Sequence, residues 1–107
     1  MQSLVTSGNT QNSTEISAWM GSFGHLVENG EISDYLVGLA AGSGQMVWKF
    51  VVKKFVDQLE NEQNFAKAST YLLALGDVEK SVEMLLKGLK FIFKNKYFIL
   101  FVIKYQL

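Results

Sequence analysis

Hydrophobic side chains recur along this chain at spacings of three and four residues, which is the period of an amphipathic helix. The pattern starts near residue 14 and is interrupted only by short polar or glycine-containing stretches. It predicts helices over residues 14–28, 33–41, 45–62 and 65–75, and a further helix that starts at residue 78.

Residues at the predicted helix ends fit capping positions. Thr14, Ser33 and Asp77 each stand where an N-cap side chain accepts a backbone N–H. Gly42 and Gly76 stand where a C-terminal residue of positive φ is favoured, because glycine has no Cβ to clash.

The apolar positions also predict which side of each helix is buried. In the first three helices these positions are Ile16, Trp19, Met20, Phe23, Leu26 and Val27; Leu36, Leu39 and Ala40; and Val47, Trp48, Val51, Val52, Phe55, Val56 and Leu59. In the last two they are Phe65, Ala68, Tyr71, Leu72 and Leu75, and Val78, Val82, Leu85, Leu86 and Leu89.

Only Gly76 and Asp77 separate the last two predicted helices, so these must fold back antiparallel. The predicted fold class is therefore all-α, made of antiparallel helical hairpins as in a fragment of a tetratricopeptide-like solenoid.

Three segments differ in composition. Residues 1–13 are rich in Ser, Thr, Asn, Gln and Gly, and they predict a mobile lead-in because they offer little to bury. Residues 14–88 carry the predicted helical-hairpin domain. Residues 89–107 form an atypical tail dominated by lysine, aromatic and aliphatic side chains.

Charge and cysteine content narrow the classes of function. The 107 residues include 10 basic and 10 acidic side chains, so the net charge gives no overall attraction to nucleic acid or to an anionic membrane. The absence of cysteine excludes disulfides and thiolate-bound zinc. The first residues have neither the basic nor the apolar region of a signal peptide, and we expect the protein to stay inside the cell.

The sequence offers little for catalysis. Gly42 and Gly44 are not followed by the lysine and hydroxyl of a phosphate-binding loop, and Val47 stands where a dinucleotide-binding loop needs a third glycine. His25 is the only histidine, and it lies in an apolar helix without an accompanying cysteine or paired acid. We therefore expect no enzyme, cofactor, metal site or small-molecule substrate.

Large aromatic side chains are the candidate anchors of the fold or of an interface. Trp48 fits a core position, and it also fits a dimer interface, where tryptophan is enriched. Together with Trp48, the candidate packing or interaction residues are Phe55, Phe65 and Tyr71.

Several short motifs carry a resemblance to a known family. They are Ala41-Gly42 before Trp48, the helix ending Phe55 to Leu59, the run Phe65-Ala66-Lys67-Ala68-Ser69 with Tyr71-Leu72-Leu73, and Val82-Glu83-Met84-Leu85-Leu86. With them, residues of about 34–87 resemble the tetratricopeptide-like middle region of the Gemin-five family of the survival-of-motor-neuron complex.

The resemblance implies a non-catalytic platform that associates with itself or with other protein subunits. It implies a setting in small nuclear ribonucleoprotein assembly and translation control, in the cytoplasm and also the nucleus. RNA is contacted by other regions in that family, so an RNA partner is implied only indirectly, and a membrane is not implied.

Two alternatives stay open. The spacing of Leu72-Leu73, Gly76-Asp77 and Leu85-Leu86 also occurs in vesicle-coat and ciliary-transport subunits, which suggests a generic helical-repeat subunit of a propeller-plus-solenoid protein. The tail, with its lysines among aromatic residues, suggests direct RNA binding.

The tail has further readings of its own. Its apolar run from Tyr97 to Ile103 is shorter than the ~20 residues that span a bilayer, although an interfacial membrane helix or packing on the hairpin also fits. The tail departs from the family pattern after Gly88, and we expect it to come from translated intron or a truncated gene.

Overall fold

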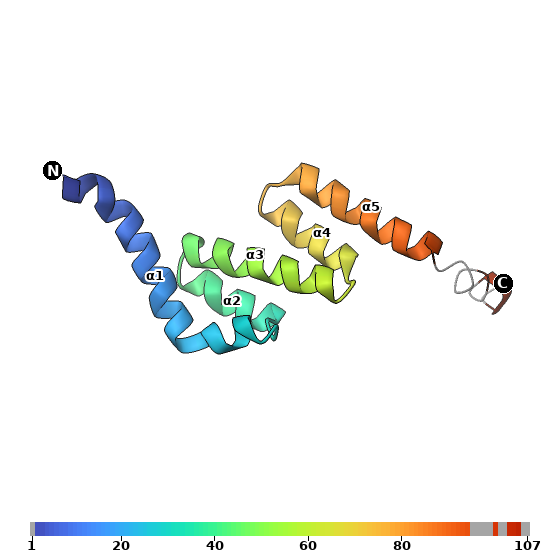
Figure 1. The fold of residues 1–107 in the computed structure, drawn as a ribbon, viewed down its shortest axis with the longest axis horizontal. Coiled ribbons are helices and arrows are strands. Elements are labelled where there is room, and N and C mark those ends of the chain that lie inside the picture. The colour runs from blue at the N-terminus through green and yellow to red at the C-terminus, as the bar shows by residue number, and fades with distance from the viewer. Residues whose placement is uncertain (1, 95–99, 101–102, 106–107) are drawn as a thin grey trace. The chain divides into compact units, whose positions relative to one another are not determined.

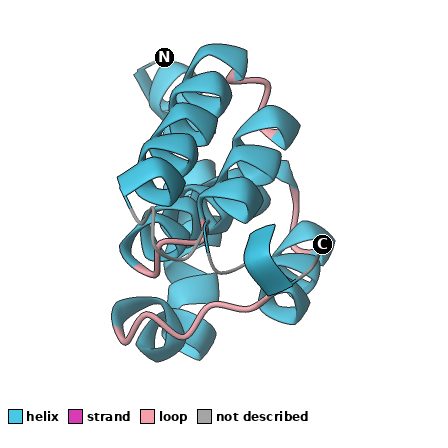
Figure 2. Cartoon of the chain, turned by 90° about the vertical axis from the view of Figure 1, so that its right-hand side faces the viewer, coloured by secondary structure: helices cyan, strands magenta, loops and turns pink. Residues whose placement is uncertain are grey.

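A computed structural model describes residues 2–94, 100 and 103–105, with side chains from Thr14 onward. The described residues form helices and no strand, which confirms the predicted all-α class (Figures 1 and 2). The helices are α1 Gln2–Glu28, α2 Asp34–Gly42, α3 Gln45–Asn61, α4 Phe65–Ala74 and α5 Val78–Lys94.

The chain divides into two compact units, residues 1–58 and residues 59–107. The N-terminal unit holds α1, α2 and most of α3. The C-terminal unit holds the last residues of α3, then α4 and α5, and it contains the candidate interaction surface.

Helix α1 begins at Gln2, so the predicted N-cap at Thr14 is wrong and Thr14 lies inside the helix. No proline interrupts residues 2–13, and each residue added to an existing helix gains a backbone hydrogen bond. The predicted lead-in is therefore helical from residue 2, while its mobility stays a prediction. The six predicted apolar positions of α1 are all buried or half-buried, with Trp19 only 5% exposed.

Helix α2 starts as predicted, because the Leu36 N–H donates to Ser33 Oγ at 3.2 Å. Leu36 and Ala40 are buried, but the prediction for Leu39 is wrong: Leu39 is 40% exposed and Val37 is buried instead. At about 100° per residue, Leu36, Ala40 and Val37 share one arc of the helix, and Leu39 lies outside it.

The turn between α2 and α3 places its positive φ at a different glycine from the predicted one. Gly42 is the last residue of α2, Ser43 is the C-cap, and Gly44 has φ of +115°. The Gly44 carbonyl accepts from the Trp48 N–H at 3.0 Å, so Gly44 opens α3. One left-handed residue is enough to reverse the chain, and the second glycine of the pair supplies it.

Helix α3 buries the predicted stripe. Val47, Val51 and Val52 are at most 1% exposed, and the other stripe residues are buried except Trp48, which is half-buried. Gln58 ties α3 to the segment before α2, because its side-chain amide accepts from the Ile32 N–H at 2.8 Å and donates to the Ile32 carbonyl at 2.9 Å. Apolar packing and the two hydrogen bonds between the Gln58 side chain and the Ile32 backbone thus hold parts of the N-terminal unit together.

The turn between α4 and α5 is built as predicted. Gly76 has φ of +86°, and Asp77 Oδ1 accepts from the Lys80 N–H at 3.1 Å. Helix α5 then continues through Gly88 to Lys94, so the predicted boundary at residue 88 does not end a helix. Of the predicted tail, residues 95–99, 101–102 and 106–107 lie outside the described residues.

Candidate interaction surface

Helices α4 and α5 pack against each other as an antiparallel hairpin (Figure 1). Two buried hydroxyls hold them together: Ser69 Oγ donates to the Ser81 carbonyl at 2.9 Å, and Ser81 Oγ donates to the Ser69 carbonyl at 3.0 Å. The two hydroxyl oxygens lie 2.7 Å apart. Each buried hydroxyl is therefore hydrogen-bonded, as buried polar groups need to be.

Small residues let the two helices approach closely. Ala68 of α4 is fully buried, and a Cβ added at Gly88 of α5 would lie 3.1 Å from Phe65 Cβ. Met84 is the large apolar residue of α5 that is buried. The contact face of α5 is therefore made of Ser81, Met84 and Gly88.

This contact face contradicts the predicted inward face of α5. The predicted residues Val78, Val82, Leu85, Leu86 and Leu89 are instead between 48% and 58% exposed. The prediction failed because it assigned the largest apolar residues to the hairpin contact, whereas the contact face of α5 combines the small residues Ser81 and Gly88 with Met84. On α4 the prediction is confirmed, since its five positions are buried or half-buried.

The exposed residues form a continuous apolar surface along α5. Ile92 and Phe93 extend it, at 47% and 70% exposure. Apart from the adjacent pairs Leu85/Leu86 and Ile92/Phe93, successive members are three or four residues apart, so all of them share one side of the helix. We call this surface the α5 stripe; its members are Val78, Val82, Leu85, Leu86, Leu89, Ile92 and Phe93.

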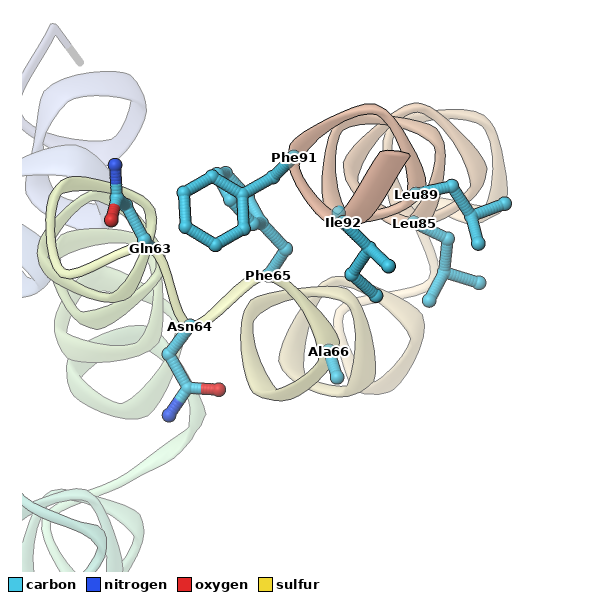
Figure 3. A pocket seen from close by; sticks show the side chains of 9 residues that line it. Gln63, Asn64, Phe65, Ala66, Leu85, Leu89, Phe91 and Ile92 are labelled. Atoms are coloured by element: carbon cyan, nitrogen blue, oxygen red, sulfur yellow. The ribbon is translucent and has the colours of Figure 1, made fainter. Parts of the chain in front are cut away.

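An apolar cavity of about 470 Å³ lies beside the stripe, between the start of α4 and the second half of α5 (Figure 3). In Figure 3 the Phe91 ring points from α5 toward Phe65, while Ile92 lies above Ala66 of α4. The Phe65 and Phe91 ring centroids are 5.9 Å apart, with the ring planes tilted by 54°. The remaining lining residues are Gln63, Asn64, Leu85, Gly88 and Leu89.

A second hollow, of about 510 Å³, has four charged side chains in its lining. We call it the lysine cleft; it is lined by Glu60, Asn61, Gln63, Phe65, Lys87, Lys90, Phe91 and Lys94. Lys87 forms an ion pair with Glu60, and this hydrogen bond and charge raise the pKa of the Lys87 ammonium. Lys90 and Lys94 are exposed, and neither pairs with any residue that the structure describes.

The four predicted anchor residues fall in both units. Phe55 is 2% exposed and Trp48 is half-buried, and both belong to α3 in the N-terminal unit. Phe65 and Tyr71 are half-buried on α4, and Phe65 lines both hollows. Their role as interaction anchors stays a prediction.

Sequence reasoning assigned Lys90 and Lys94 to a tail that suggests RNA binding, and it missed the contact of Phe91 with Phe65 and the exposure of the α5 stripe. One signal was present: Ser69, Ser81 and Gly88 are small residues at positions where two helices of a hairpin could meet closely. The spacing of Ser81 and Gly88 along α5 marks a contact face that the apolar pattern alone does not reveal.

Two further findings concern the described part of the chain. Among those residues, no three His, Cys, Asp or Glu side chains gather closely enough to hold a metal ion. None of the helices formed by the described residues combines the length and apolar character needed to cross a lipid bilayer.

Comparison with known proteins places this hairpin in a family. The model of the GEMI5 TPR domain matches residues 1–98, so the match includes the N-terminal segment and also residues 89–98, which we expected to depart from the family. Gem-associated protein 5 of Mus musculus is 32% identical over 85 residues, which is 76% of this chain and 6% of the mouse protein.

Gem-associated protein 5 of Homo sapiens is 32% identical over 75 residues, which is 66% of this chain and 5% of the human protein. The chain thus spans only a small part of the length of these relatives. No solved structure gives a significant match. On the family match and the two relatives, this chain belongs to the family of the GEMI5 TPR domain, the helical-repeat region of Gem-associated protein 5.

Proposed function

We propose that this chain is a non-catalytic scaffold that associates with a second copy of itself through the α5 stripe. The carrying observation is the exposure of seven large apolar side chains along one side of a single helix. Soluble monomers seldom leave so continuous an apolar surface in water, and such surfaces commonly mark interaction sites.

The stripe offers enough apolar surface for association. Fully burying a valine, leucine, isoleucine or phenylalanine contributes about 1.5–3 kcal/mol, so burying the exposed half of each contributes roughly 1 kcal/mol. Helix α5 has 17 residues and is about 25 Å long, which allows a second helix to lie along the whole stripe.

The charges beside the stripe favour a second copy as the occupant. Glu79 and Glu83 flank the first half of the stripe, and Lys90 and Lys94 flank the second half on the same side. Glu83 and Lys90 lie symmetrically about the point between Leu86 and Lys87, and so do Glu79 and Lys94.

This symmetry matches an antiparallel pair of α5 helices. When two copies meet about a two-fold axis at that midpoint, Glu83 of each copy lies opposite Lys90 of the other, and Glu79 opposite Lys94. In a parallel pair the charged flanks of the two copies lie on opposite sides of the contact, so these Glu–Lys pairs do not form. The charge pattern therefore supports an isologous, antiparallel contact between two copies.

The biological setting is proposed from family membership. Gem-associated protein 5, as its name says, is associated with Gem proteins. We place the scaffold in small nuclear ribonucleoprotein assembly and translation control, in the cytoplasm and also the nucleus, as the resemblance to the Gemin-five family implies.

The test replaces apolar members of the stripe that do not line the cavity. In the full chain, Val82→Ser with Leu86→Ser removes two side chains that are each 50% exposed, so helix α5 should fold while self-association weakens at least tenfold. Sedimentation equilibrium over a range of protein concentrations measures the association constant, and circular dichroism checks the helix content.

Tyr35→Ser provides a matched control, because Tyr35 is also a large exposed side chain, at 76%, but lies on α2. It should leave the association constant unchanged. A strictly monomeric unmodified chain at tens of micromolar, or equal association of the stripe variant and the control, would contradict the proposal.

A further inference from the structure

We propose that the lysine cleft binds a short acidic peptide segment of a partner protein. Carboxylates of the peptide lie on Lys90 and Lys94, and an apolar side chain between them lies on the Phe65–Phe91 pair. This goes beyond self-association, because the occupant is a different protein and the cleft includes residues outside the α5 stripe. Lys90 and Lys94 also face Glu83 and Glu79 of the second copy in the proposed dimer, so the peptide and the second copy compete for these two lysines.

The charges of the cleft favour an anionic ligand with separate negative groups. Glu60 already neutralises Lys87, which leaves Lys90 and Lys94 as the unpaired cations among the described lining residues. They are one helical turn apart, about 6 Å along α5. Two acidic side chains at i and i+4 of a helix, or at i and i+2 of an extended peptide, have nearly the same spacing.

The aromatic floor favours an aliphatic side chain over a nucleic-acid base. Phe65 and Phe91 contact each other with their ring planes tilted by 54°, so they form a fixed apolar floor. Proteins that bind single-stranded nucleic acid present aromatic ring faces on which successive bases stack. Because Phe65 and Phe91 contact each other, each has less free ring face for a base.

The polar walls give a second reason to favour a peptide. Asn61 and Gln63 are exposed and carry side-chain amides that both donate and accept hydrogen bonds. The Glu60 carboxylate only accepts, so it suits the N–H groups of a peptide backbone and repels a continuous phosphodiester chain. The cleft therefore combines acceptors for peptide N–H groups with cations for peptide carboxylates.

The probe is a fluorescein-labelled peptide in which glutamate alternates with leucine, and its binding is followed by fluorescence anisotropy. The protein is the full chain with Val82→Ser and Leu86→Ser, so that failure of self-association and failure of peptide binding are measured separately. We expect saturable binding in the micromolar range at low salt, and at least about tenfold weaker binding after Lys90→Glu with Lys94→Glu.

Lys53→Glu with Lys54→Glu is the matched control. These lysines are also exposed and lie on α3, and their replacement changes the net charge by the same amount as the replacement of Lys90 and Lys94. The control should leave peptide affinity within about twofold, and a peptide with glutamine in place of glutamate should not bind.

Three results would overturn the proposal. The first is equal loss of affinity in the two lysine variants, which would indicate a general charge effect. The second is equal binding of the glutamine peptide, or no saturable binding of the glutamate peptide. The third is tighter binding of a single-stranded oligouridine than of the peptide, with the same dependence on Lys90 and Lys94, because the cleft would then be a nucleic-acid site.

Discussion

At the scale of single residues, the hydroxyl groups of Ser69 and Ser81 are buried between α4 and α5, where each donates to the backbone carbonyl of the other residue. Those carbonyls lie inside helices, where they are expected to accept backbone N–H groups as well. The reciprocal arrangement makes the two hydroxyls dependent on each other. Removing one hydroxyl leaves the other bonded to its backbone carbonyl, but it takes away the 2.7 Å contact between the two oxygens and the side-chain donor to one carbonyl.

Ser69→Ala should lower the free energy of unfolding by about 0.5–1.5 kcal/mol, because the Ser81 carbonyl loses the donor Ser69 Oγ and the Ser81 hydroxyl loses its contact with that oxygen. Ser69→Ala with Ser81→Ala should cost less than the sum of the two single changes, since each single change already removes the contact between the two hydroxyls and the double change removes it only once. Urea denaturation of the three variants and the unmodified chain gives the coupling free energy. Strict additivity would show that the two hydroxyls do not act as a pair.

At the scale of whole elements, the ends of the helices depend on which glycine adopts positive φ. Gly42 lies at the end of α2 in a helical conformation, with no atom within 4 Å of an added Cβ, whereas Gly44 has φ of +115°. Sequence spacing does not distinguish the two positions. Their backbone conformations predict opposite effects of the same substitution.

Gly42→Ala should raise the free energy of unfolding by up to about 1 kcal/mol, because alanine loses less backbone entropy in a helix. Gly44→Ala should lower it by about 1 kcal/mol or more, since alanine is strained at positive φ. Thermal melting of both variants checks the signs. If Gly42→Ala instead lowered the stability and Gly44→Ala raised it, the residue of positive φ would be Gly42 and not Gly44.

Much of each element could be predicted from the sequence, because periodic apolar residues and caps act locally. The α3 stripe and the caps at Ser33 and Asp77 were found in this way. The burial of α5 could not be predicted, because its broad apolar arc fits more than one orientation of the helix. Only the close contact at Ser81 and Gly88 decides which side meets α4. The lysine cleft was missed for the same reason, since only that orientation brings Phe91 against Phe65 and puts Lys90 in the lining of the same cleft.

At the scale of the whole molecule, the charge symmetry along α5 specifies how two copies should pair. Glu83→Lys places two lysines opposite each other, twice in the dimer. Exposed ion pairs contribute about 0.2–1 kcal/mol each, so self-association should weaken about fivefold. Adding Lys90→Glu restores opposite charges across the two-fold axis and should return the association constant to within about twofold of the original.

Analytical ultracentrifugation at low and high salt measures the association constants of the unmodified chain and of these two variants. The difference in association constant between Glu83→Lys and the variant with both Glu83→Lys and Lys90→Glu should become smaller at high salt, because salt screens exposed charges. If the variant with both changes associates as weakly as Glu83→Lys alone, the antiparallel register is wrong. The stripe could still be the contact surface in that case.

The α4–α5 hairpin has a consequence for the order of folding and binding. The residues that hold it together are close along the chain; Ser69 and Ser81 are only 12 positions apart. Contacts over so short a separation close quickly and lose little chain entropy. The hairpin can therefore form before α5 meets any partner, and it presents the stripe and the lysine cleft as ordered surfaces. Association then does not have to order α5 as well, so the rate of encounter, rather than the rate of folding, should limit how fast the complexes form.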